Sequence, residues 1–158
     1  MSLIKIILNP IAGRGYGAKV EPELLRLLKA EGLDFDLVRT ERPWHATELA
    51  AQAASAGFEL IVAAGGDGTT NEVVNGLLAA AKDGVAGTLG IIPVGSGSDF
   101  ANTVGVPADL PGACHRLAHG MPVAVHSCLI RFCPAIRVLG AWAGSPCRAS
   151  PCGTLTTP

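Results

Sequence analysis

The first 125 residues alternate between short apolar segments and segments with a helical hydrophobic stripe. These segments have the length and composition of strands, and they cover residues 3–8, 59–64 and 88–93, which are mostly apolar, and 36–40, where Leu37 and Val38 lie between polar residues. Apolar residues at helical spacing follow the first three of them, over residues 20–31, 46–57 and 73–81. This order requires crossover connections, so the sequence predicts a three-layer α/β fold with a parallel sheet between two layers of helices.

Glycine-rich loops follow the first, third and fourth predicted strands. Their sequences are NPIAGRGYG at 9–17, GGDGTTNE at 65–72 and PVGSGSDF at 93–100. Glycine permits positive φ and a close approach of the backbone, so successive N–H groups can point at phosphate oxygens. The hydroxyls of Thr69 and Thr70, at the start of the next helix, can cap that helix and donate to a phosphate. Because parallel strands end at the same edge of a sheet, we expect a phosphate site there.

Asp67 stands among the glycines of the second loop. A carboxylate repels phosphate unless a cation such as magnesium lies between them, or unless it accepts a proton or a sugar hydroxyl. Asp67 therefore indicates chemistry at this loop. The alternative is a tight turn in which Asp67 only caps the helix, but that does not explain three such loops.

Charge and known motifs exclude several classes of protein. The net charge of −1 provides no basic field for nucleic acid. No apolar run approaches the roughly 18 residues of a membrane helix, so we expect no signal peptide and a cytoplasmic location. A Walker P-loop needs a Gly-Lys pair, which the sequence lacks. The dinucleotide pattern that begins at Gly13 has Thr40 in place of its ribose-binding acid.

Taken together, the three loops resemble the catalytic domain of the diacylglycerol kinase family, which includes bacterial lipid kinases, sphingosine kinases and ceramide kinases. The resemblance rests on Asn9-Pro10 with Gly13-Arg14-Gly15, on GGDGTTNEV at 65–73, and on P-x-GSG-x-DFA at 93–101. Their order and spacing agree over residues 3–125. NAD kinases share only the shorter Gly-Gly-Asp-Gly-Thr element.

The resemblance implies the nucleotide-binding lobe of an ATP-dependent lipid kinase, with ATP and Mg²⁺ as cofactors. The implied substrate is a lipid alcohol, diacylglycerol or a sphingoid base, reached by transient contact with a membrane surface. Asp67 would be the catalytic or metal-linked acid. The residues that the resemblance places around the nucleotide are Asn9, Thr40, Gly65, Gly66, Asp67, Gly68, Thr69, Thr70, Asn71, Glu72, Gly95 and Ser96.

The sequence departs from the family pattern in two places. Ser98 replaces the usual Asn, which weakens a hydrogen bond near the nucleotide. Family members also continue into a β-rich second lobe that carries the lipid pocket and a further catalytic acid, and we expect that lobe to be missing here. A catalytically incompetent nucleotide-binding module is therefore an alternative function. An NAD kinase is a weaker alternative, because the first and third motifs argue against it.

Residues 126–158 differ in composition from the rest of the chain. They hold four of the five cysteines and no acidic residue, and they show no helix or strand periodicity. The cysteines are spaced Cys-x4-Cys, unlike the usual Cys-x2-Cys of zinc sites. We therefore divide the chain into an ATP-binding domain at 1–125 and an atypical tail at 126–158, which we interpret as disordered or as a change of reading frame.

Three further features of the sequence lead to separate expectations. His115 and His119 have metal-ligand spacing, but the sequence shows no third ligand, so we interpret them as solvated histidines. Trp44 could stack on an adenine ring, although simple packing is the favoured explanation. A content of 49% hydrophobic and 16% charged residues, with a missing partner lobe, predicts a homo-oligomer.

Overall fold

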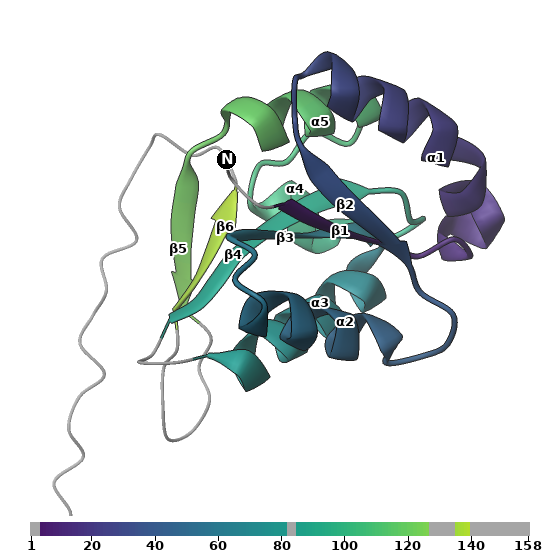
Figure 1. The fold of residues 1–158 in the computed structure, drawn as a ribbon. Coiled ribbons are helices and arrows are strands. Elements are labelled where there is room, and N and C mark those ends of the chain that lie inside the picture. The colour runs from purple at the N-terminus through teal and green to yellow at the C-terminus, as the bar shows by residue number, and fades with distance from the viewer. Residues whose placement is uncertain (1–3, 82–84, 127–134, 140–158) are drawn as a thin grey trace, which may run out of the picture.

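Six strands form one sheet in the order β2-β1-β3-β4-β6-β5 (Figure 1). The computed structural model describes residues 4–81, 85–126 and 135–139. Neighbouring strands are parallel from β2 through to β6, and β5 is antiparallel to β6. The strands are β1 (Ile4–Leu8), β2 (Phe35–Arg39), β3 (Leu60–Gly65), β4 (Val85–Pro93), β5 (Pro122–His126) and β6 (Ala135–Leu139).

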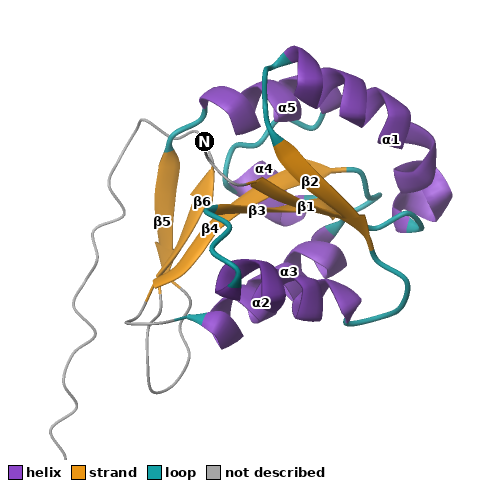
Figure 2. Cartoon of the chain, in the orientation of Figure 1, coloured by secondary structure: helices purple, strands orange, loops and turns teal. Residues whose placement is uncertain are grey.

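Helices cover both faces of this sheet, as Figure 2 shows. Helices α1 and α5 lie on one face, and α2 and α3 pack together on the other. The helices are α1 (Ala12–Ala30), α2 (His45–Ser55), α3 (Asp67–Ala80), α4 (Asp99–Thr103) and α5 (Leu110–His119). The predicted three-layer α/β architecture is therefore confirmed. None of the helices in the described ranges combines the length and the apolarity needed to span a bilayer.

The core follows the apolar pattern of the sequence. Strand β3 is buried over all six residues because both of its faces are covered by helices. The predicted stripe of α1 is buried at Val20, Leu24 and Leu28, and α2 contributes small alanines that allow a close approach to α3. These contacts place the carboxyl ends of β1, β3 and β4 side by side.

The closest packing between α2 and α3 occurs at Gly76. A Cβ built on Gly76 would lie 2.8 Å from the Ala50 Cβ and would also meet the carbonyl oxygen of Thr47. Gly76→Ala is therefore expected to lower the free energy of unfolding by about 1–3 kcal/mol, because the two helices must separate. Urea unfolding would measure this. The neighbouring exposed variant Asn75→Ala should stay within about 0.5 kcal/mol of wild type, and an equal loss for both variants would contradict the packing argument.

Several elements differ from the sequence-based expectations. The bounds of α1 start at Ala12 rather than Val20, although Gly13, Arg14 and Gly15 have non-helical φ and ψ. Strand β4 begins at Val85 rather than Thr88, and α4 and β5 were not predicted. The tail at 126–158 shows no strand periodicity in the sequence, yet residues 135–139 form β6. This strand is too short to show a clear periodicity. It is identified by its pairing with β4 on one side and β5 on the other. The predicted boundary at residue 125 falls within β5, and the division into two domains stays a prediction.

Candidate functional site

The three glycine-rich loops meet at the carboxyl edge of the sheet, where β1 and β3 lie next to each other. The chain leaves β1 into α1 on one face of the sheet and leaves β3 into α3 on the other face (Figure 1). This divergence creates a crevice between the two strand ends, and ligands of open α/β sheets bind in such crevices.

Asn9 links the first loop to the second across this crevice. Its side-chain Nδ2 donates a hydrogen bond to the Thr69 hydroxyl at 3.0 Å, and its Oδ1 accepts from the backbone N–H of Ile11 at 3.1 Å. Thr69 is buried, so its hydroxyl is held in a fixed position. The amide of Asn9 therefore orders both loops at once.

The second and third loops touch through their backbones. A Cβ built on Gly95 would lie 2.5 Å from the Cα of Gly66 and 2.8 Å from its nitrogen. Hydrogen bonds join the loops on either side of this contact, from Val94 N–H to the Gly65 carbonyl and from Asp67 N–H to the Gly97 carbonyl. Glycine is required at residue 95 because no side chain fits between the two loops.

The first loop contains a left-handed turn that neither glycine spacing nor periodicity predicts. Three consecutive residues have positive φ, 59° at Gly13, 58° at Arg14 and 87° at Gly15. A Cβ at Gly13 would lie 2.8 Å from the Val94 carbonyl oxygen, so this turn packs against the third loop. Arg14 is the exception to the preference for glycine at such φ values, and strained residues of this kind concentrate at functional sites.

Asp67 connects α3 to α4 rather than capping its own helix. Its Oδ2 accepts from the N–H of Asp99 at 3.1 Å, and its Oδ1 accepts from the N–H of Phe100 at 3.2 Å. The carboxylate thus caps the first turn of α4 and complements the positive end of that helix. These bonds hold it at the crevice, and a second lone pair on each oxygen is available to a ligand.

Glu72 makes the equivalent connection between α3 and α2. Its Oε2 accepts from the N–H of Ala46 at 3.2 Å, in the first turn of α2, and its backbone carbonyl accepts from the Thr47 hydroxyl at 2.9 Å. The residue at the N-cap of α2, Trp44, makes no side-chain cap bond and has a left-handed φ of 63°. Glu72 therefore replaces the usual N-cap side chain of that helix.

Two adjoining cavities open at the crevice. The larger, about 400 Å³, is surrounded by the glycine-rich loops, and the smaller, about 240 Å³, lies beside the segment that follows β2. The residues that line both cavities are Asn9, Thr69 and Glu72. Those that line only the larger are Ala12, Gly13, Gly66, Asp67, Gly68, Gly95, Ser96 and Gly97. Those that line only the smaller are Ile11, Thr40, Glu41, Arg42, Pro43 and Ala46.

Nine of the twelve predicted site residues line these cavities, and three do not. Gly65 is buried, and a Cβ there would meet the Thr69 side chain. The Thr70 hydroxyl donates to the Gly66 carbonyl at 3.2 Å and is almost fully buried, so it is directed at the backbone of its own helix. Asn71 is exposed on α3 away from both cavities. Trp44 is 60% exposed and does not line the described cavities.

The sequence identified Thr40 as a site residue but not its neighbours Glu41, Arg42 and Pro43, which also line the smaller cavity. They belong to an irregular segment between β2 and α2, where no periodicity identifies a site. A hydrogen bond to the Glu48 carboxylate raises the pKa of the Arg42 guanidinium, and the same contact lowers the pKa of the Glu48 carboxyl. This pair is therefore charged at neutral pH, with Arg42 at the wall of the cavity.

The donors that line the larger cavity suit an anion and a hard cation together. In α3 the N–H groups of Gly68 and Thr69 belong to the first turn, where no intrahelical acceptor exists. Within the described chain, the Asp67 N–H bonds to Gly97 and the Thr70 N–H to Gly66, which leaves these two amides for a ligand. The carboxylates of Asp67 and Glu72, with the Asn9 amide oxygen, are the oxygen ligands that Mg²⁺ prefers.

Comparison with known proteins gives a consistent result. The family model described as "Diacylglycerol kinase catalytic domain" matches residues 4–130. The diacylglycerol kinases of Bacillus subtilis and Staphylococcus haemolyticus are 43% and 39% identical to the chain over 109 residues, which is 69% of this chain. These matches span only 35% and 32% of the relatives, so the chain covers about a third of their length.

Solved structures give the same assignment. The crystal structure of a diacylglycerol kinase from Bacillus anthracis has a TM-score of 0.67 and 33% identity to the chain. The similarity covers 79% of this chain and 45% of that one. The matched residues include every strand end and loop that forms the crevice. The chain belongs to the diacylglycerol kinase catalytic-domain family.

Proposed function

We propose that this chain is the ATP-binding part of a lipid kinase, which transfers the γ-phosphoryl group of ATP to the hydroxyl of a lipid alcohol. The observation that supports the proposal most is the start of α3, where two amides without an intrahelical partner line a glycine-walled cavity. The N-terminus of a 14-residue helix and a glycine-rich loop together attract phosphate groups.

The two cavities suggest how the nucleotide is divided between them. The phosphates would lie in the larger cavity, against the amides of Gly68 and Thr69 and beside Gly95. The nucleoside would lie in the smaller cavity, where Thr40 and Pro43 offer a hydroxyl and an apolar surface. Asn9 and Thr69 line both cavities, so in this proposal they would lie at the junction between nucleoside and phosphates.

The proposal includes a divalent cation because two acidic residues line the larger cavity. Asp67 and Glu72 face the phosphate position from the same helix, and their charge would repel ATP alone. They would hold Mg²⁺, which neutralises charge on the phosphates during transfer. We further propose that Asp67 positions the acceptor hydroxyl or takes its proton, because hydrogen bonds from α4 fix the orientation of its carboxylate.

The substrate and location follow from the same proposal. Relatives that carry the name diacylglycerol kinase support diacylglycerol as the acceptor, and a sphingoid base is the alternative. Such substrates reside in membranes, so the domain would contact a membrane surface during turnover. The cytoplasm, where ATP is available, is the proposed location.

Calorimetric titration with ATP in the presence of Mg²⁺ tests nucleotide binding. Asn9→Ala is expected to weaken ATP binding by about tenfold, because loss of one hydrogen-bonding side chain contributes roughly 1.4 kcal/mol. Asn71→Ala removes an amide from the same region but away from both cavities, and it should bind ATP like wild type. Equal affinities for all three proteins, or no ATP binding by wild type, would contradict the site.

A transfer assay separates the proposed kinase from the alternatives. The chain is incubated with γ-labelled ATP and with diacylglycerol, a sphingoid base or NAD, and labelled products are resolved. A labelled lipid supports the lipid kinase, and labelled NADP identifies an NAD kinase. ATP binding without any transfer identifies a nucleotide-binding module.

A further inference from the structure

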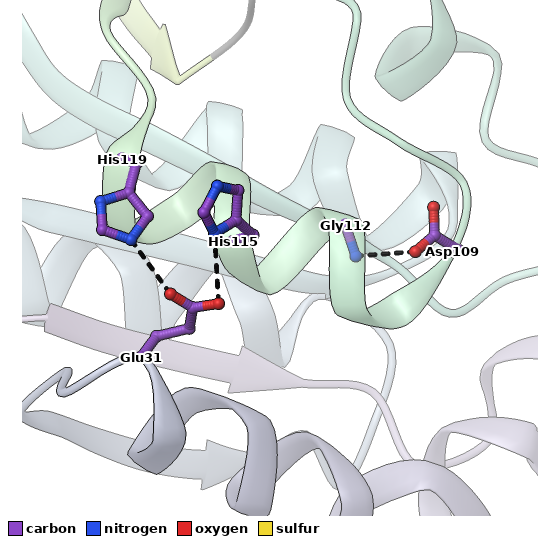
Figure 3. A network of polar contacts seen from close by, with 5 residues as sticks. All are labelled: Glu31, Asp109, Gly112, His115 and His119. Carbon is purple, nitrogen blue, oxygen red and sulfur yellow. Dashed lines mark hydrogen bonds and ion pairs between the residues drawn. The ribbon is translucent and has the colours of Figure 1, made fainter.

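A cluster of three side chains lies away from the glycine-rich loops. His115 and His119 are four residues apart on α5, so both project from the same face of that helix. The sequence offers no obvious third ligand near them. The structure supplies one, because Glu31 at the end of α1 lies against both rings (Figure 3).

The geometry of this cluster is that of a chelating site. Glu31 Oε1 lies 3.3 Å from His115 Nδ1, and Glu31 Oε2 lies 3.1 Å from His119 Nε2. One ligand atom from each residue can be chosen so that all three lie within 4.8 Å of one another. Figure 3 shows the two imidazoles turned toward the same carboxylate from one side of α5. The three donors therefore converge with little need for rearrangement.

Rigid elements hold the donors in place. The N-terminus of α5 is capped by Asp109, whose Oδ1 accepts from the Gly112 N–H at 2.7 Å (Figure 3). The same helix is anchored in the core by the buried residues Cys114 and Leu117. Glu31 is three-quarters buried at the end of α1, whereas both histidines are more than half exposed. An ion can therefore reach the two imidazoles from solvent.

The donor set selects the class of ion. Two imidazole nitrogens and one carboxylate oxygen are ligands of divalent transition metals, whereas Mg²⁺ and Ca²⁺ prefer oxygen ligands alone. A His-x3-His pair on one helix face is a recurrent zinc arrangement, with a water completing the four ligands. An adjoining cavity of about 290 Å³, lined in part by His115, Arg116 and His119, has room for that water.

The cluster is independent of the proposed nucleotide site. Helix α1 starts beside the glycine-rich loops, at the carboxyl ends of the strands, and runs back toward the side where the strands begin. Its last residues are therefore remote from the loops (Figure 1). The chain continues from α1 into β2, whose first residue pairs with the first residue of β1, so Glu31 and the two histidines bonded to it lie on the side of the sheet where these strands begin. We propose that Glu31, His115 and His119 bind a divalent transition-metal ion of the Zn²⁺ class, which joins the end of α1 to α5.

Zinc titration of the full chain tests the site. The chain is first treated with iodoacetamide so that accessible thiols do not compete for the metal, and Zn²⁺ binding is then measured by calorimetry. Glu31→Gln and His115→Ala are each expected to weaken binding at least about tenfold, because each removes one of three ligands. His45→Ala removes a histidine outside the cluster and should bind Zn²⁺ like wild type. Equal binding by all four proteins would overturn the proposal.

Two further measurements identify the ligands directly. Long-range ¹H–¹⁵N spectra of the imidazole rings should show Zn²⁺-dependent shifts at His115 and His119 and none at His45. Zn²⁺ should also raise the melting temperature of wild type but not of His119→Ala, because the ion binds the folded form preferentially. Shifts confined to other histidines, or a rise of equal size in both proteins, would contradict the assignment. Neither measurement uses ATP, so the result is independent of the proposed function.

Discussion

Gly68→Asp is expected to lower the affinity for ATP by at least about 100-fold without unfolding the chain. Gly68 lines the larger cavity, and a Cβ built on it meets no atom within 4 Å. The new carboxylate would stand beside Asp67 where phosphate groups are proposed to lie. The new carboxylate and a phosphate group about 4 Å apart would repel each other by roughly 4 kcal/mol at an effective dielectric constant near 20. A 100-fold loss of affinity corresponds to only about 2.7 kcal/mol.

The position of Gly68 makes this variant informative. It lies in the first turn of α3, where an acidic side chain stabilises the helix through its dipole. A loss of ATP binding therefore cannot be attributed to a weaker fold, and urea unfolding should give wild-type or greater stability for Gly68→Asp. Calorimetric titration with ATP and Mg²⁺ gives the affinity.

Two matched controls separate charge from shape. Gly68→Asn has nearly the same volume without the charge, so it should lose less affinity than Gly68→Asp. Asn71→Asp adds the same charge to the same helix but away from both cavities. Its affinity for ATP should stay within about threefold of wild type, because a single exposed charge changes a free energy by less than about 1 kcal/mol. An unchanged affinity for Gly68→Asp would refute the phosphate position.

The sequence predicted the layered fold because buried strands and helices show regular patterns of apolar residues. The run at 59–64 is apolar at every residue except Glu59, and the structure buries β3 on both faces. The spacing of Val20, Leu24 and Leu28 predicted the buried side of α1 for the same reason. Strands β5 and β6 carry no such signal, since their place depends on pairing between segments that are distant along the chain.

The sequence predicted those parts of the candidate site where close backbone contacts require glycine. Gly66 and Gly95 approach each other through their backbones, and a glycine-rich sequence reveals that requirement. The roles of the polar side chains were less predictable, because a carboxylate or hydroxyl has several partners within reach. Asp67 bonds to α4, Glu72 caps α2, and Thr70 bonds to its own helix. Only the folded chain decides among these partners.

The same limit applies to His115 and His119. Their spacing along one helix was visible in the sequence, but their partner Glu31 is more than eighty residues away along the chain. The packing of α1 against α5 brings these residues together. A ligand set shared by two helices is therefore hidden from local pattern analysis, whereas a glycine-rich loop is not.

Asp67→Asn is expected to abolish the dependence of ATP binding on Mg²⁺. In the proposed site wild type should bind ATP at least about tenfold more tightly with Mg²⁺ than without it, because the cation offsets repulsion between the carboxylates and the phosphates. The amide removes one charge and one metal ligand, so the ratio of the two affinities should fall toward one. The titration is done with and without Mg²⁺, the latter in the presence of a chelator.

This variant also changes a structural contact, which must be measured separately. The substituted amide side chain would have one acceptor oxygen for the two N–H groups of Asp99 and Phe100, so one N–H loses its partner and faces an NH₂ group. The free energy of unfolding should fall by about 1–3 kcal/mol, as measured by urea unfolding. The fold should persist, because the core under the loops is unchanged.

Asp99→Asn provides the matched control for both measurements. Asp99 lies beside Asp67 and is exposed, and its side chain does not line the larger cavity. The control should therefore keep the Mg²⁺ dependence and lose little stability. If Asp67→Asn lowered stability but retained the full effect of Mg²⁺, Asp67 would be a structural cap of α4 alone. The metal-linked role would then pass to Glu72, the other carboxylate that lines this cavity.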